Sequence, residues 1–150
     1  MPTIEGLEEL TQNLENLGVN VERELPRIAK RAMTQRVERR AKETCPVGQS
    51  RPGYTGGRLR TSIATQIVRT DAGSEIRTGT NVEYAPFVEY GTGWRGASVG
   101  APHPDDYIFG PKPGMLPRPY LRPAWDRLQE TVMDDIEADL QALVEEAARK

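Results

Sequence analysis

The chain has 150 residues, which fits one domain of ordinary size. A formal net charge of −2 is too small for the disordered class, although Leu, Ile, Val and Phe together make up only a fifth of the residues. One cysteine and one histidine exclude an intramolecular disulfide and a zinc site built from Cys and His. We therefore expect a single folded domain over residues 1–150 with a thin core.

Apolar residues at spacings of three and four predict two amphipathic helices in the first third of the chain. One covers residues 4–17 and ends at Gly18. The second covers residues 21–41 and ends before the breakers of residues 45–48. Pro26 leaves the start of this second helix open, because proline suits a first turn and kinks a helix interior.

Alternating β-branched residues then predict a β-hairpin. Its strands are expected at residues 59–70 and 75–82, with the turn at residues 71–74. Residues 84–91 predict a short helical turn that Gly91 ends. The last element is a long amphipathic helix over residues 122–148, which is roughly 40 Å at 1.5 Å per residue.

Between these elements, residues 91–119 hold six Gly and six Pro and predict an extended, protruding arm. The arm carries Trp94, Tyr107 and Phe109. Such aromatic residues either anchor a partner or fold back over their own sheet, and the sequence leaves both readings open. The predicted fold class is α+β: N-terminal helices, a small antiparallel sheet with a β-hairpin, a long C-terminal amphipathic helix and a Gly/Pro-rich arm.

Charge is balanced overall but not locally. The basic helix of residues 27–42, from Arg27 to Lys42, has a net charge of +6, and residues 126–150 have a net charge of −5. The two segments pair within one subunit or across a subunit interface, or else the basic helix binds DNA phosphates. We favour pairing, because the chain is acidic overall and no aromatic residue lies among those arginines.

No set of residues predicts catalysis, a cofactor or a metal site. His103 stands between two prolines in an extended loop, and the loop at residues 55–60 lacks a phosphate-binding motif and runs into a predicted strand. Glu89 is expected to make a structural hydrogen bond or ion pair, with Arg58, Arg60 or Arg122 as candidate partners. We expect a protein that is not an enzyme, spans no membrane and has no signal peptide.

Three blocks of sequence resemble a known family. They are residues 54–63 (YTGGRLRTSI), 83–92 (EYAPFVEYGT) and 117–124 (PRPYLRPA). They resemble the phage tail-component family of head–tail joining, or tail-completion, proteins of long-tailed phages. The chain departs from that pattern by an additional glycine at Gly56–Gly57 and by Tyr120, where Phe is usual.

The resemblance implies a virion structural protein of the head–tail joint (neck), which completes or caps the tail as part of an oligomeric ring, with a hexamer as the expected order. Its partners would be further copies of itself and neighbouring neck and tail-tube proteins, with genomic DNA passing through the lumen unbound. We hypothesise that the basic helix meets the acidic helix of a neighbour and that the arm clasps an adjacent subunit. The alternative is a DNA-binding protein that uses the basic helix. The hypothesised interface residues are Arg36, Arg39, Arg40, Arg58, Arg60, Glu89, Trp94, Tyr107, Phe109, Arg122, Asp134 and Glu137.

Overall fold

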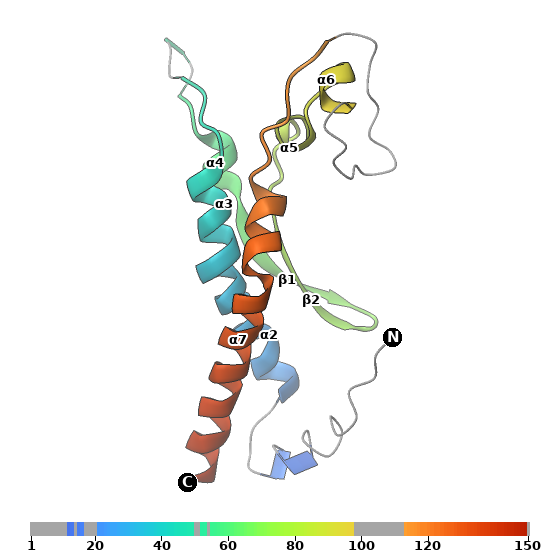
Figure 1. Ribbon diagram of the computed structural model, residues 1–150. Coiled ribbons are helices and arrows are strands. Elements are labelled where there is room, and N and C mark those ends of the chain that lie inside the picture. Colours follow the sequence, from blue (N-terminus) through green and yellow to red (C-terminus); the bar gives the residue numbers. More distant parts are fainter. Residues whose placement is uncertain are drawn as a thin grey trace.

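The computed structural model describes residues 12, 13, 15, 16, 21–49, 52, 53, 55–97 and 113–149. Its elements confirm the α+β class, with helices, an antiparallel β-hairpin and a long last helix (Figure 1). The helix predicted over residues 4–17 lies largely outside the described residues. In chain order the elements are α2 (Val21–Met33), η1 (Thr34–Glu38, a π-helical stretch), α3 (Arg39–Thr44), α4 (Arg58–Ser62), β1 (Ala64–Thr70), β2 (Gly73–Gly79), α5 (Ala85–Tyr90), α6 (Gly93–Ala97) and α7 (Leu121–Ala148).

Two long helical segments lie side by side and form the body of the molecule (Figure 1). The first runs without interruption through α2, η1 and α3, with Pro26 inside α2. It ends as expected, because Cys45 adopts an extended backbone with φ −60° and ψ 125°. The second is α7, which begins one residue before the predicted start and ends at the predicted residue. No described helix is long and apolar enough to cross a membrane.

The predicted hairpin is present as β1 and β2, which pair antiparallel and pack against α2 and η1. Thr70 pairs with Gly73, so the turn consists of Asp71 and Ala72 alone. On the buried side the hydroxyls of Thr65 and Thr78 lie 2.9 Å apart across the strands. The second strand ends at Gly79, three residues earlier than predicted.

The first strand was predicted to start at Leu59, and this prediction is wrong. Residues 58–62 form the short helix α4 instead, and the strand begins at Ala64. Two hydroxyls favour the helix, because Thr61 donates to the carbonyl of Gly57 and Ser62 donates to that of Leu59. Gly57 precedes the helix at φ +98°, a conformation that glycine adopts at no steric cost.

The core is thin, as composition predicts, and is built largely from small side chains. Tyr120, Ile63, Val37 and Val132 are its largest fully buried members. The cluster lies where α3, α4, α5 and the start of α7 meet and continues down between the two long helical segments. Its members are Ala32, Val37, Ala41, Cys45, Leu59, Ile63, Val82, Ala85, Tyr120, Ala124 and Val132.

Candidate functional site

Two ion pairs join the long helical segments along a line that we call the charged seam. The Arg36 guanidinium binds the Asp135 carboxylate in a bidentate arrangement, with Nε 2.6 Å from Oδ2 and Nη2 3.0 Å from Oδ1. One turn of α7 further on, Arg31 pairs with Asp139 at 2.5 Å. All four side chains border a shallow hollow between α2, η1 and α7. The opposite charges of the basic and acidic helices therefore meet within one chain.

Each partner of the bidentate pair stabilises the charged form of the other. Hydrogen bonding and charge from Asp135 hold the pKa of the Arg36 guanidinium above its ordinary value. The hydrogen bond from Arg36, supported by its charge, holds the pKa of Asp135 below its ordinary value, although burial acts in the opposite direction. The carboxylate is therefore charged throughout the neutral pH range.

We expect the contribution of this pair to stability to be lost in acid. Because the folded pKa of Asp135 is depressed, the contribution is complete above the ordinary carboxyl pKa of about 4 and is lost as pH falls through the lower folded value. Asp135→Asn should destabilise the protein at neutral pH, and its difference from the wild type should shrink as the pH approaches about 2. Urea unfolding at a series of pH values measures this difference. Asp71→Asn, in the exposed hairpin turn, is the control, and a difference for Asp135→Asn that does not change with pH would contradict the prediction.

The remaining basic side chains of the helix at residues 27–42 are also largely paired within the chain. Arg39 and Arg40 both face Glu43, at 3.9 and 3.4 Å. Arg27 pairs with Glu24, and Lys42 pairs with Glu38. The hypothesis that this helix meets the acidic face of a neighbour is therefore not supported for Arg36, whose acidic partner is in the same chain. The DNA-binding alternative meets the same obstacle, because phosphates would have to displace these carboxylates.

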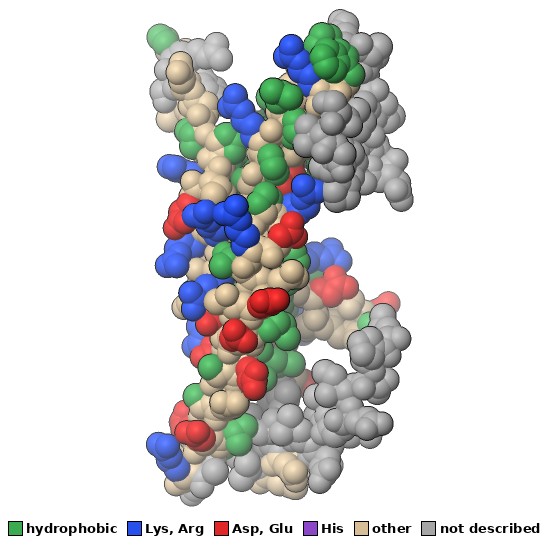
Figure 2. Space-filling model, in the orientation of Figure 1, with side chains coloured by type: hydrophobic (Ala, Val, Ile, Leu, Met, Phe, Trp, Pro, Cys, Tyr) green, Lys and Arg blue, Asp and Glu red, His purple; other side chains and the backbone are tan. Residues whose placement is uncertain are grey.

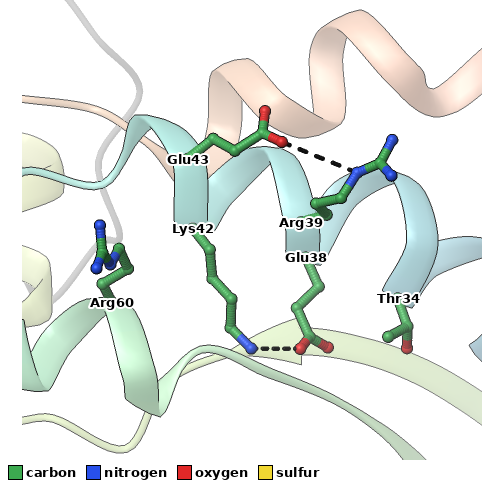
Figure 3. Close-up of a pocket in the computed structure, with 6 residues that line it drawn as sticks. All are labelled: Thr34, Glu38, Arg39, Lys42, Glu43 and Arg60. Carbon is green, nitrogen blue, oxygen red and sulfur yellow. Dashed lines mark hydrogen bonds and ion pairs between the residues drawn. The ribbon is translucent and has the colours of Figure 1, made fainter.

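A second hollow lies between α4 and the end of the basic helix (Figure 3). It is lined by Arg60 together with the charged side chains of Glu38, Arg39, Lys42 and Glu43. Glu38 and Lys42 point to one side and pair at 2.7 Å, whereas Arg60 stands on α4 without a bond to the residues drawn. Burial acts to raise the pKa of Glu38, but hydrogen bonds from Lys42 and Thr65 outweigh it and lower the pKa. The hollow is thus lined by a fixed ion pair. Among the described residues, no group of three or more His, Cys, Asp or Glu is placed to hold a metal ion.

Glu89 has a structural role, as predicted, but its partners are backbone groups. Its carboxylate is buried, 8% exposed, at the start of α7. Oε2 accepts hydrogen bonds from the backbone N–H groups of Tyr120 at 2.9 Å and Leu121 at 3.1 Å. Oε1 accepts one from the backbone N–H of Arg122 at 3.0 Å. The contact with Arg122 is thus to its backbone, and no contact with Arg58 or Arg60 is found among the described residues.

These bonds explain why a glutamate stands at this position. The first N–H groups of a helix have no partner inside the helix, and the helix dipole favours negative charge there. Tyr120 and Leu121 follow two prolines in quick succession, so the chain enters α7 without a side-chain cap of its own. Glu89 supplies that cap from α5, and the carbonyl of Val88 accepts a further bond from the Arg118 N–H at 2.8 Å. Residues 84–91 and 117–124 are thereby fixed to each other.

The two ends of the predicted arm lie side by side. The Thr92 N–H donates to the Met115 carbonyl at 2.9 Å, and the Met115 N–H donates to the Thr92 hydroxyl at 2.8 Å. The Arg95 N–H donates to the Pro113 carbonyl at 3.2 Å. Residues 98–112, with Tyr107 and Phe109, lie outside the described residues. The described ends of residues 91–119 are therefore joined to each other in a base of the predicted arm, which includes the short helix α6 that the sequence did not predict.

Gly91 is required at this base. Its φ is +75°, and a Cβ there would lie 2.5 Å from the Met115 carbonyl oxygen and 2.8 Å from the Pro117 nitrogen. We expect Gly91→Ala to lower the free energy of unfolding by about 2 kcal/mol or more, from backbone strain and from the close backbone contacts. Thermal or urea unfolding measures the loss. Gly79→Ala is the matched control, because a Cβ there meets nothing within 4 Å. Equal effects of the two substitutions would show that the base is not closely packed.

Large apolar side chains are exposed around this base. Trp94 is 54% exposed, with the Arg95 guanidinium 5.6 Å from its ring centre. Phe87 is 49% and Leu116 57% exposed. Of the hypothesised interface residues, Arg39, Arg58, Arg60, Asp134 and Glu137 are also exposed. Figure 2 shows basic side chains gathered over the upper part of the visible face and acidic side chains following the lower half of α7.

Comparison with known proteins gives one family. Residues 8–91 match the model of the family described as "Bacteriophage HK97-gp10, putative tail-component". The matched range includes α2 to α5 and therefore Arg36, Arg60 and Glu89. No curated protein and no solved structure matches the chain.

Proposed function

Because the chain belongs to the HK97-gp10-like tail-component family of bacteriophages, we propose that it is a virion structural protein of the head–tail joint. In this role it completes or caps the tail and connects it to the head as one subunit of an oligomeric ring, with a hexamer as the expected order. Its partners are further copies of itself and the neighbouring neck and tail-tube proteins. It is assembled in the cytoplasm of the bacterial host, and genomic DNA passes through the lumen without specific binding.

The observation that carries this proposal is the exposed apolar surface at the base of the arm. Trp94 and Leu116 are each more than half exposed, while the buried cluster contains few large side chains. Aromatic and aliphatic side chains exposed together are typical of surfaces that another protein covers. A subunit that buries part of its apolar surface against its neighbours is expected to have both an exposed apolar surface and a core with few large side chains.

A structural role rather than catalysis also fits the described charged groups. Asp135 and Asp139 hold the two long helical segments together, and Glu38 is paired with Lys42. Glu89 caps α7. Each of these carboxylates is committed to a contact that orders the subunit, so we propose that the protein is not an enzyme.

Production of phage particles without this protein tests the role. A lysate that holds DNA-filled heads beside free tails of complete length would support joining, and over-long tails would support termination. Native mass measurement of the purified protein gives the ring order. Joined, infectious particles of normal yield in the absence of the protein would refute the neck role.

A further inference from the structure

The side of α7 that faces away from the core has an unusual composition. Glu130, Asp134 and Glu137 are exposed and follow one another at spacings of four and three, so they share one side of the helix. Met133 lies among them and is 61% exposed. The opposite side carries the buried Ala124 and Val132 and the carboxylates of the charged seam. We call the side formed by Glu130, Met133, Asp134 and Glu137 the outward face of α7.

A second surface carries the complementary charge. Arg58 and Arg60 on α4 and Arg118 before α7 are exposed, and their guanidinium groups have no carboxylate partner among the described residues. The two segments adjoin, because Leu59 of α4 and Tyr120, two residues after Arg118, are buried in one cluster. Leu116, 57% exposed, precedes Arg118 by two residues. On α4, Arg58 and Arg60 flank the buried Leu59. We call Arg58, Arg60 and Arg118, the exposed arginines of α4 and of the segment before α7, the arginine surface.

Within one chain the two surfaces lie at different heights along α7. The arginine surface lies at the start of α7, and Glu137 is sixteen residues beyond Leu121 on the same continuous helix. Glu130 is nine residues beyond Leu121, so at a rise of 1.5 Å per residue the acidic side chains lie about 14 to 24 Å along the helix from its start. Among the described residues neither set of side chains has an oppositely charged partner, and each chain carries both halves of a matching contact.

We propose that the outward face of α7 in one copy docks against the arginine surface of the next copy, with Met133 and Leu116 as the apolar centre of the contact. This rests on the proposed ring. The two surfaces differ, so the contact is heterologous, and such a contact closes into a ring when its rotation permits. Three carboxylates facing three guanidinium groups fix the direction of the subunits. A second copy is the partner that presents both the positive charge and the exposed apolar side chain.

A charge exchange between the surfaces tests the contact. One full-length variant carries Glu130→Lys, Asp134→Lys and Glu137→Lys, and the other carries Arg58→Glu, Arg60→Glu and Arg118→Glu. Each alone should raise the concentration for half-assembly about tenfold or more, because like charges then face each other. An equimolar mixture should assemble again, in rings of alternating variants. Native mass measurement and sedimentation in low salt record the species.

The control variant carries Glu22→Lys, Asp71→Lys and Glu75→Lys, which changes the net charge by the same amount at exposed positions on α2 and the β-hairpin, outside α4, α7 and the segment before α7. It should assemble as the wild type does. Met133→Ala removes the apolar centre without a change of charge and should weaken assembly while leaving the melting temperature nearly unchanged. Circular dichroism confirms that each variant is folded.

Three results would overturn the contact. They are normal assembly of either charge variant alone, a mixture that stays monomeric, and a wild type that stays monomeric but shifts duplex DNA through the arginine surface. The neck role is judged separately from phage made without the protein. A ring that forms through another surface, in phage that still needs the protein, refutes the contact and leaves the role intact.

Discussion

Glu89→Ala is expected to lower the free energy of unfolding by about 3–5 kcal/mol. The carboxylate is 8% exposed and accepts the backbone N–H groups of Tyr120, Leu121 and Arg122. Alanine leaves these donors at a helix start without an acceptor, and each buried donor without a partner costs about 1–3 kcal/mol. The negative charge that favours the helix N-terminus is lost as well.

Two further variants separate these effects. Glu89→Gln keeps the shape and one acceptor oxygen but loses the charge, so it should cost about 1–2 kcal/mol. Glu83→Gln, at an exposed position in the same segment, should change stability by less than about 0.5 kcal/mol. Urea unfolding at neutral pH measures all three. If Glu89→Ala costs no more than Glu83→Gln, Glu89 does not hold the start of α7.

The sequence predicted the role of Glu89 but not its partners. A charged residue between Val88 and Tyr90 in a packed turn must find a partner, and arginine side chains were the natural candidates. The observed partners are N–H groups 31 to 33 residues further along the chain. The prolines at positions 117 and 119 hint at a helix start that needs an outside cap. Only the fold shows which carboxylate reaches it.

Elsewhere in the chain, too, the sequence pattern predicted elements better than it predicted the contacts between them. Apolar residues at spacings of three and four predicted both long helical segments correctly, because each segment buries one side. The prediction of a strand at residues 59–62 was wrong, because hydrogen bonds from side-chain hydroxyls to the backbone and the conformation of Gly57 favour a helical turn there. The charges of the basic and acidic helices predicted that they pair. Whether they do so within a chain depends on how the helices turn toward each other, and that follows from the core.

The three sequence blocks of the family resemblance meet at one place in the fold. Leu59 and Ile63 of the first block are buried with Tyr120 of the third. The second block supplies Glu89, which caps α7, and Gly91, which permits the close approach of residues 115–117. The blocks thus encode a junction between α4, α5 and the start of α7. Both the base of the arm and the arginine surface are built on that junction.

Tyr120→Ala should be comparably damaging, because Tyr120 is the largest fully buried side chain and lies at the centre of this junction. Loss of a buried aromatic ring costs about 3–5 kcal/mol. Tyr120→Phe should cost less than about 1 kcal/mol at neutral pH, because no described group hydrogen-bonds the hydroxyl and phenylalanine is usual in the family pattern. Urea unfolding of both variants measures the difference.

The buried hydroxyl of Tyr120 also predicts how the stability of the protein changes at alkaline pH. Burial raises the pKa of Tyr120 far above its ordinary value, and the charge of Glu89 raises it further. A raised folded pKa gives a contribution to stability that is complete below the unfolded pKa of about 10 and is lost as pH rises toward the folded value. Tyr120→Phe should therefore gain stability relative to the wild type between about pH 9 and pH 11. A stability difference that stays flat over this range would mean that the hydroxyl reaches solvent, and the junction would then be more open than its burial implies.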